Sequence, residues 1–299
     1  MPVFNTAQYL REALSSVRSQ QFDDFELVVV NDGSTDESSE ILRAFSQREP
    51  RMRLIERPNQ GLIYTRNQLL QEARGDLVAW MDSDDLSHPE RYMRQVAAFD
   101  ANPELVCLGT NVQVVDPDGM PLGVEEFPHD DAGIRLEQSR GTGFRFPSTM
   151  QRRSAAIAAG GFRHPFRIGE DLDFLLRVAE QGRVANLPDF LYVYRQHLLN
   201  TCTTMGTYWP EYRSAILKLA DERRECGSDS LQRGHEILLP QFNPVDARKL
   251  IPVVLVNWAR EALAVGDRAR ACRYILRSIK ISPLRHQAWR QLIKTLLPL

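Results

Sequence analysis

Apolar positions in the first hundred residues follow two alternating patterns. Residues 6–20 carry apolar side chains at intervals of three and four, which predicts a helix, whereas residues 25–30 form an apolar run. Such a run is typical of a strand in a parallel sheet that is covered on both faces. Further helices are predicted up to about residue 48, over 62–73 and over 88–101, and further strands over 52–56 and 77–81. This alternation predicts an α/β fold with a doubly wound, mostly parallel sheet.

The second half of the chain changes character. Strands are predicted over 105–116, 149–152 and 190–194 and helices over 154–159 and 170–180, while 127–146 is expected to be irregular. Beyond residue 205 the apolar spacing is helical throughout. We therefore expect an α/β domain over residues 1–204 and a helical C-terminal appendage over residues 205–299.

The start of the chain departs from the usual order of such a sheet. A doubly wound sheet normally opens with a strand before its first helix, and residues 1–5 leave little room for one. We therefore expect the first strand to be missing, or the natural start to lie upstream of Met1.

Charge is distributed unevenly along the chain. The formal net charge is −2, yet residues 246–299 hold eleven Lys or Arg against three Asp or Glu. A basic region with apolar faces suits peripheral contact with anionic lipid, and equally suits a helical cap with solvated Arg side chains. Nothing in the composition favours a nucleic-acid partner.

Neither the cysteines nor the apolar runs indicate an extracellular or membrane-spanning protein. The four cysteines have no paired spacing, so neither a zinc site nor a disulfide framework is predicted. The longest apolar run, residues 251–258, is too short to span a bilayer. We expect a cytoplasmic protein, with peripheral contact at the inner face of the membrane as the alternative to a free one.

Candidate chemistry is concentrated after two predicted strands. Asp82, Asp84 and Asp85 follow the strand at 77–81, and Asp32 follows the strand at 25–30. Crowded carboxylates repel and raise each other's pKa unless a cation joins them, and their spacing suits Mg²⁺ or Mn²⁺. The alternative is an Asp-rich turn that caps a helix. Ligands of such sheets bind beyond the carboxyl ends of the strands, where both groups lie.

Seven short motifs in order resemble those of the family-2 glycosyltransferases, over residues 2–204. They are Pro2-Val3-Phe4-Asn5, Val30-Asn31-Asp32-Gly33-Ser34-Thr35-Asp36, Asn59-Gln60-Gly61, Arg66-Asn67, Asp82-Ser83-Asp84-Asp85, Glu170-Asp171 and Tyr194-Arg195-Gln196-His197. The resemblance implies a GT-A fold, a nucleotide-sugar donor, a divalent metal, and sugar transfer with inversion at the anomeric carbon.

The resemblance also implies roles for single residues. Those expected to bind the nucleotide sugar are Pro2, Phe4, Asp32, Gly61, Arg66, Asp82 and Ser83, with Asp32 on the base. The implied metal ligands are Asp84, Asp82 and His197, and the implied catalytic residues are Asp171 as general base and Glu170 as a neighbour that could exchange roles with it. Asp85 is expected to cap the following helix or to hold the site in place.

We therefore expect an inverting, Mn²⁺- or Mg²⁺-assisted enzyme that moves a sugar, from UDP in the first instance, to a saccharide or lipid-linked glycan acceptor. Two alternatives remain. One is a non-catalytic binding or scaffold protein with the same fold, inactive because its first strand is missing. The other is a nucleotidyltransferase, which would need a Gly-rich phosphate loop near the N-terminus, and the sequence has none.

Overall fold

The computed structural model describes residues 1–141, 143–198, 200, 208–240, 247–284, 286 and 288–291. The chain forms two compact units, each built from several segments. The first contains Met1–Val112, Glu126–Tyr194 and Tyr212–Leu239, and the second contains Gln113–Glu125, Arg195–Glu211 and Pro240–Leu299. The domain boundary at residues 204–205 stays a prediction.

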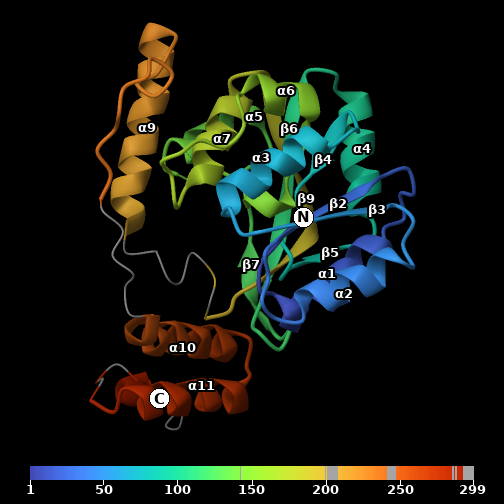
Figure 1. The fold of residues 1–299 in the computed structure, drawn as a ribbon. Coiled ribbons are helices and arrows are strands. Elements are labelled where there is room, and N and C mark those ends of the chain that lie inside the picture. The colour runs from blue at the N-terminus through green and yellow to red at the C-terminus, as the bar shows by residue number, and fades with distance from the viewer. Residues whose placement is uncertain are drawn as a thin grey trace. The chain divides into compact units, whose positions relative to one another are not determined.

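The N-terminal part of the first unit is a three-stranded parallel sheet with helices on both faces. Its strands are β1 (Pro2–Val3), β2 (Leu27–Asp32) and β3 (Met52–Arg57), in that order, and its helices are α1 (Ala7–Arg18), α2 (Ser38–Ser46) and α3 (Leu62–Glu72). Helices α1 and α2 lie on one side of the sheet and α3 on the other (Figure 1). Every residue of β2 is buried, as its unbroken apolar run predicts.

The first strand is present, so the expectation that it is missing is wrong. Strand β1 pairs in parallel with β2, with Pro2 opposite Val30 and Val3 opposite Asn31. Two residues leave no detectable hydrophobic period, which is why the sequence pattern did not show the strand. Pro2 is tolerated because it is the first residue of an edge strand, where a missing N–H costs no ladder bond.

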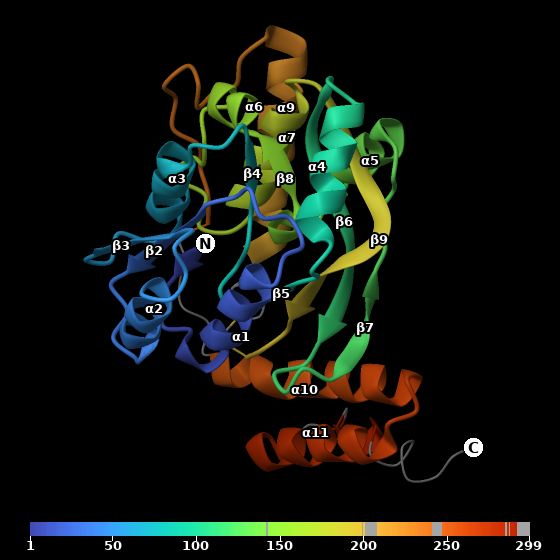
Figure 2. The same ribbon diagram turned by 90° about the vertical axis from the view of Figure 1, so that its right-hand side faces the viewer.

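A second sheet, most of which lies in the first unit, contains the strand that leads into the acidic motif. Its strand order is β4 (Leu77–Ala79), β8 (Met150–Arg152), β6 (Leu105–Val115), β9 (Arg183–Arg195) and β5 (Leu86–Ser87), with β7 (Pro121–Glu125) beside β6 (Figure 2). The β4–β8, β6–β8 and β5–β9 pairs are antiparallel. The accompanying helices are α4 (Arg91–Ala101), α5 (Asp131–Gln138), η1 (Phe146–Ser148), α6 (Arg153–Ala158), α7 (Glu170–Ala179) and α9 (Trp209–Cys226). The α/β class is confirmed.

Two local predictions differ from the structure. The segment 127–146, expected to be irregular, contains α5, whose start is capped by Asp130 accepting the Gly133 N–H at 2.8 Å. Its one fully buried aliphatic side chain, Ile134, is too weak a periodic signal to predict a helix. The last strand extends from 183 to 195 rather than from 190 to 194, because it runs past the polar residues that interrupt its apolar pattern.

An aromatic cluster forms the core under the carboxyl end of β4. Trp80, Phe146, Phe162 and Phe174 have ring centroids between 4.2 and 6.3 Å apart, mostly in edge-to-face contact. All four rings are buried. The cluster joins β4, η1 and α7, so it fixes the segments that carry the acidic residues on one rigid support.

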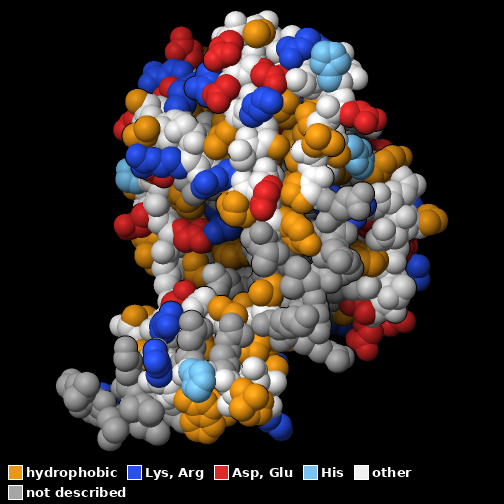
Figure 3. Space-filling view, turned by 90° about the vertical axis from the view of Figure 1, so that its left-hand side faces the viewer, with side chains coloured by type: hydrophobic (Ala, Val, Ile, Leu, Met, Phe, Trp, Pro, Cys, Tyr) orange, Lys and Arg blue, Asp and Glu red, His pale blue; other side chains and the backbone are white. Residues whose placement is uncertain are grey.

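The second unit is organised around a helical hairpin of α10 (Ala247–Ala264) and α11 (Arg268–Ile281). Trp258 packs edge-on against Tyr274 with 5.5 Å between ring centroids, and the Tyr274 hydroxyl donates to Asp116. The surface of the hairpin mixes apolar and basic side chains (Figure 3). None of the helices in the described part of the chain is both long and apolar enough to cross a bilayer.

Candidate active site

Asp32 lies at the carboxyl end of β2, and the loop after β3 surrounds its carboxylate. Oδ1 accepts the Gln60 N–H at 2.8 Å and Oδ2 accepts the Gly61 N–H at 2.9 Å, while Arg57 Nη1 donates to Oδ1. The residue is 4% exposed. A carboxylate has about four acceptor positions, so these three donors leave room for one more. Asp32 is therefore an oriented acceptor at the rim of the sheet.

Arg57 was not predicted, although it is the side chain that most closely constrains Asp32. Its guanidinium also donates at 2.8 Å to Gln68 Oε1 and to Thr65 Oγ1. The Tyr64 ring covers the guanidinium with 4.7 Å from Cζ to the ring centroid, and Tyr64 remains 49% exposed. The signal was present in the sequence, because Arg57 ends the strand next to β2 and so shares its rim.

Phe4 provides a second exposed ring on the same rim. It follows Val3, whose register partner is Asn31, so Phe4 and Asp32 each lie one residue beyond that pair. Phe4 is 48% exposed, whereas Pro2 is buried in the strand behind it. An apolar side chain this exposed at the end of an otherwise buried strand fits contact with a planar ligand. The binding roles of Phe4 and Pro2 stay predictions.

The acidic motif follows β4 at the edge of the second sheet. Asp82 and Asp84 are partly exposed, whereas Ser83 and Asp85 are buried. Burial raises the pKa of Asp82, Arg66 opposes that shift, and Asp84 adds to it. Asp85 is not the cap of the next helix, because the N-cap of α4 is Glu90. Its carboxylate accepts the Tyr192 hydroxyl at 2.8 Å, which supports the alternative that it holds the site in place.

Arg66 links the acidic motif to the start of α7. Its Nη1 donates to Glu170 Oε1 at 2.6 Å, and its Nη2 lies 3.7 Å from Asp82 Oδ1. The guanidinium lies over the Phe146 ring, 4.6 Å from the centroid, and the residue is 5% exposed. Its Nε is buried without a partner among the described residues. A buried cation with spare donor capacity next to two carboxylates can bind a further anionic group.

Glu170 and Asp171 occupy the first turn of α7 in different environments. Glu170 is 6% exposed, and its burial raises its pKa to about 7 even though Arg66 opposes the shift. Asp171 is half-buried, its Oδ1 accepts the Leu172 N–H at 2.8 Å, and its charge raises the pKa of both Glu170 and Asp82. Arg66, Asp82, Glu170 and Asp171 therefore form one electrostatic group, with Asp171 the more accessible of the two α7 carboxylates.

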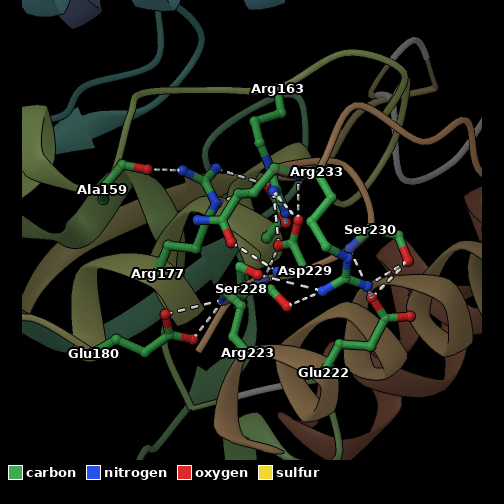
Figure 4. A network of polar contacts seen from close by, with 12 residues as sticks. Ala159, Arg163, Arg177, Glu180, Glu222, Arg223, Ser228, Asp229, Ser230 and Arg233 are labelled. Atoms are coloured by element: carbon green, nitrogen blue, oxygen red, sulfur yellow. Dashed lines mark hydrogen bonds and ion pairs between the residues drawn. The ribbon is translucent and has the colours of Figure 1, made fainter. Parts of the chain in front are cut away.

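A buried network of charges anchors α7 from behind (Figure 4). Arg163 contacts both Asp173 and Asp229, with 2.8 Å between its Nη1 and Asp229 Oδ2, and Arg177 Nη2 donates to Asp173 Oδ2 at 2.6 Å. Arg223 on α9 lies 2.5 Å from Asp229. Both aspartates have no exposed side-chain surface. The network ties α9 and the turn after it to the helix that carries Glu170 and Asp171.

The carboxylate oxygens of the acidic motif fit a hard divalent cation that is coordinated partly by the bound nucleotide sugar. No three His, Cys, Asp or Glu side chains within the described ranges are grouped as a metal site. Asp82 and Asp84 are nevertheless close enough for the charge of Asp84 to raise the pKa of Asp82. Mg²⁺ and Mn²⁺ prefer oxygen ligands, and Mg²⁺ is typically held by one or two carboxylates together with phosphate and water. The residues present fit such an ion.

The remaining predicted residues are placed as follows. Ser83 accepts the Thr6 hydroxyl at 3.0 Å, which joins the motif to the start of α1. Gly61 is the N-cap of α3 with φ of +90°, a backbone conformation that favours glycine. His197 belongs to the second unit, where its backbone N–H donates to Asn200. Their ligand and metal roles stay predictions.

Comparison with known proteins decides the family. The model of glycosyl transferase family 2 matches residues 1–159, which is more than half of the chain. The chain belongs to glycosyl transferase family 2. In this glycosyltransferase the matched range includes β2, β3, α3 and the loop after β4, with the acidic and basic site residues that they carry. Helix α7 lies beyond the matched range.

Curated relatives of this glycosyltransferase include two that are named putative glycosyltransferases. A putative glycosyltransferase, EpsH of Bacillus subtilis strain 168, is 38% identical over 94% of this chain and 91% of its own. The putative glycosyltransferase EpsE of the same strain is 33% identical over 66% of this chain and 71% of its own. A chondroitin synthase of Pasteurella multocida is 27% identical over 67% of this chain but only 20% of its own. The protein is therefore a glycosyltransferase.

Solved structures confirm the GT-A architecture. S. aureus TarS 1-349 in complex with UDP-GlcNAc superposes with a TM-score of 0.63 at 18% identity, over 98% of this chain and 87% of that one. A mannosyltransferase from Pyrobaculum calidifontis in complex with GDP-Man and Mn²⁺ gives 0.52 at 18% identity, over 99% and 85%. At this identity the likeness concerns the fold.

Proposed function

We propose that this glycosyltransferase transfers a sugar, with inversion, from a nucleotide sugar to a saccharide or lipid-linked glycan acceptor, with a UDP-sugar as donor. The observation that carries the proposal is the group formed by Arg66, Asp82, Glu170 and Asp171 beside the carboxyl end of β4. It combines a cation that can face a phosphate, carboxylates that can hold a metal, and a carboxylate that can accept a proton.

The donor base is recognised on the β1–β3 rim. Asp32 offers an acceptor fixed by Arg57 and two backbone N–H groups, which suits the imino N–H of a uracil. Phe4 and Tyr64 supply exposed rings on either side of that carboxylate along the rim. The structural neighbours hold UDP and GDP sugars respectively, and a carboxylate acceptor also suits the ring N–H of guanine, so the choice of UDP follows the family resemblance.

The diphosphate lies at the acidic motif. Asp84 and Asp82 would hold Mn²⁺ or Mg²⁺, and a bound ion would supply charge neutralisation to the leaving diphosphate. Ser83 and Gly61 lie in the two segments that would line the donor site. Arg66 adds a buried positive charge held in one orientation by Glu170. A fixed cation of this kind stabilises developing negative charge without reorganising.

Asp171 acts as the general base. The acceptor hydroxyl oxygen forms a bond to the anomeric carbon while the bond from that carbon to the diphosphate oxygen breaks on the opposite face. The Asp171 carboxylate takes the hydroxyl proton, and the products are the inverted glycoside and a nucleoside diphosphate. Asp171 is favoured over Glu170 because Glu170 is buried and paired with Arg66.

The hairpin of α10 and α11 would bring the enzyme to a lipid-linked acceptor at the inner face of the membrane. Arg273, Arg277 and Lys280 are exposed on α11, interleaved with exposed Leu276 and Ile281. A helix with this composition binds anionic bilayers through charge and apolar burial together. The competing account is a cytoplasmic enzyme whose basic hairpin is merely solvated.

Vesicle co-sedimentation separates these two accounts. The full chain should pellet with phosphatidylglycerol vesicles and stay in solution with phosphatidylcholine vesicles. Replacing Arg273, Arg277 and Lys280 together with Gln should abolish pelleting, whereas the matched triple replacement of exposed Arg11, Arg48 and Arg74 with Gln should not. Equal pelleting by both triple variants would exclude the hairpin as the membrane contact.

The alternative of a non-catalytic binding or scaffold protein is no longer supported. It rested on a missing first strand, and β1 pairs with β2 as the fold requires.

A donor panel tests the proposed donor. Thermal unfolding of the full chain in Mn²⁺ should shift upward with UDP-sugars and much less with CDP-sugars, because cytosine has no ring N–H to donate to Asp32. Asp32→Asn should reduce the UDP-sugar shift, because an amide presents a donor where the base N–H also donates. No shift with any nucleotide sugar would contradict the proposal.

A further inference from the structure

One hydroxyl group on β9 forms hydrogen bonds with two residues of the acidic motif. Tyr192 Oη donates to Asp85 Oδ2 at 2.8 Å and accepts the backbone N–H of Asp82 at 3.3 Å. Tyr192 and Asp85 are buried, at 0% and 1% exposed. A single oxygen therefore contacts both ends of the four-residue motif and fixes the distance between them.

The chain on either side of the motif is attached to the same support. After the motif, β5 pairs antiparallel with β9, with Ser87 opposite Tyr192. Before the motif, Arg91 Nη2 donates to the Trp80 carbonyl at 2.9 Å, and the same guanidinium lies 4.9 Å from the centroid of the Tyr192 ring. The loop that carries Asp82 and Asp84 is therefore held by Arg91 before the motif, by the Tyr192 hydroxyl within it and by the β5–β9 pairing after it. Both carboxylates remain partly exposed.

One phenol hydroxyl can make both contacts at once. It donates its proton to Asp85, and a lone pair remains for the Asp82 N–H.

We infer that Tyr192 is a positioning residue for divalent-metal binding, setting the separation of the Asp82 and Asp84 carboxylates through the Asp82 backbone. This inference rests on the proposed function of the motif. Two like charges on a short loop repel and would spread apart on an unrestrained chain. Partners behind metal-binding side chains typically account for 10- to 100-fold in metal affinity, because they fix ligand orientation.

The test compares two tyrosines of the same core. Tyr192→Phe removes only the hydroxyl and keeps the ring beside Arg91. Tyr92→Phe is the matched control, since Tyr92 is also buried and its ring packs on Phe25 with 5.4 Å between centroids. Calorimetric titration of Mn²⁺ into each full-length protein saturated with UDP gives the metal Kd, and titration of UDP in EDTA gives the metal-free Kd.

The predicted result is a rise of about tenfold in the Mn²⁺ Kd for Tyr192→Phe. Its UDP Kd in EDTA should be unchanged, and both Kd values of Tyr92→Phe should stay within about twofold of wild type. Asp85→Asn provides a second arm and should also raise the Mn²⁺ Kd, because a neutral acceptor holds the hydroxyl less firmly. A wild-type Mn²⁺ Kd in Tyr192→Phe, or an equal rise in the Tyr92→Phe control, would overturn the inference. Absence of Mn²⁺-dependent UDP binding by the wild type would instead overturn the proposed function.

Discussion

Arg66 and Glu170, 104 positions apart in the chain, form a buried ion pair with 2.6 Å between Nη1 and Oε1. The pair joins α3 to the first turn of α7 and places Arg66 Nη2 at 3.7 Å from Asp82. It therefore connects the side of the site that would hold the diphosphate to the side that would hold the general base.

Replacing one partner of this ion pair should lower the free energy of unfolding far more than replacing both partners. Arg66→Met leaves Glu170 buried without its cation, and we expect a loss of about 3–5 kcal/mol in the free energy of unfolding at pH 8. The double variant Arg66→Met, Glu170→Met should recover a large part of that loss. Urea unfolding of the two single variants and the double variant measures the coupling, and additive losses would show that the pair does not act as a unit.

Stability should depend on pH through Glu170. Its pKa is about 7 in the folded protein against the ordinary 4.5, so between pH 5 and 7 the folded state holds a proton that the unfolded state has lost. The free energy of unfolding should therefore fall as pH rises through this window, by roughly 2–4 kcal/mol at about 1.4 kcal/mol per unit of pKa difference. Urea unfolding in EDTA at pH 5 and pH 8 should show this fall in the wild type but not in Glu170→Gln. An identical fall in the variant would assign it to other groups.

The charge network behind α7 should be sensitive to loss of Asp229. This carboxylate is buried between Arg163 and Arg223, so Asp229→Ala should destabilise the fold by about 3–5 kcal/mol, because it breaks two buried ion pairs and leaves each guanidinium with one carboxylate partner in place of two. Asp221→Ala is the matched control on α9, because its ion pair with Arg224 is solvent-exposed and should contribute less than about 1 kcal/mol. Chemical unfolding of both variants measures the difference, and similar losses would contradict the role of the network.

The strands that carry the site could be predicted from the sequence, but the contacts that orient the site could not. Asp32 and Asp82 were found because each follows an apolar run, although β2 and β4 belong to two different sheets and β4 pairs antiparallel with β8. Strand β1 escaped the pattern because two residues have no period. Tyr192 and Asp85 are 107 positions apart, and no local pattern pairs a buried phenol with a buried carboxylate. From the sequence, Arg91 would be expected on the solvated face of its helix, yet the packing of α4 buries it completely.

If Asp171 is the general base, its replacement should lower turnover without changing the affinity for the UDP-sugar. Asp171→Asn keeps the shape of the side chain but cannot accept the acceptor proton, so kcat should fall by about 10²–10⁴ while the UDP-sugar Kd stays within about twofold. Asp100→Asn, on the exposed end of α4, should leave both values unchanged. Steady-state release of nucleoside diphosphate together with calorimetry measures both quantities. A fall in Asp171→Asn below tenfold would move the base to another group.

Calorimetric titration of UDP into the wild type and into Asp84→Asn, each in Mn²⁺ and in EDTA, tests the central claim most directly. We predict that Mn²⁺ tightens UDP binding to the wild type by at least tenfold. In Asp84→Asn the Kd in Mn²⁺ should rise to the value in EDTA, and the EDTA value itself should not change. Equal UDP affinity with and without Mn²⁺ in the wild type, or an unchanged metal effect in Asp84→Asn, would contradict the claim that this motif binds the metal–diphosphate group.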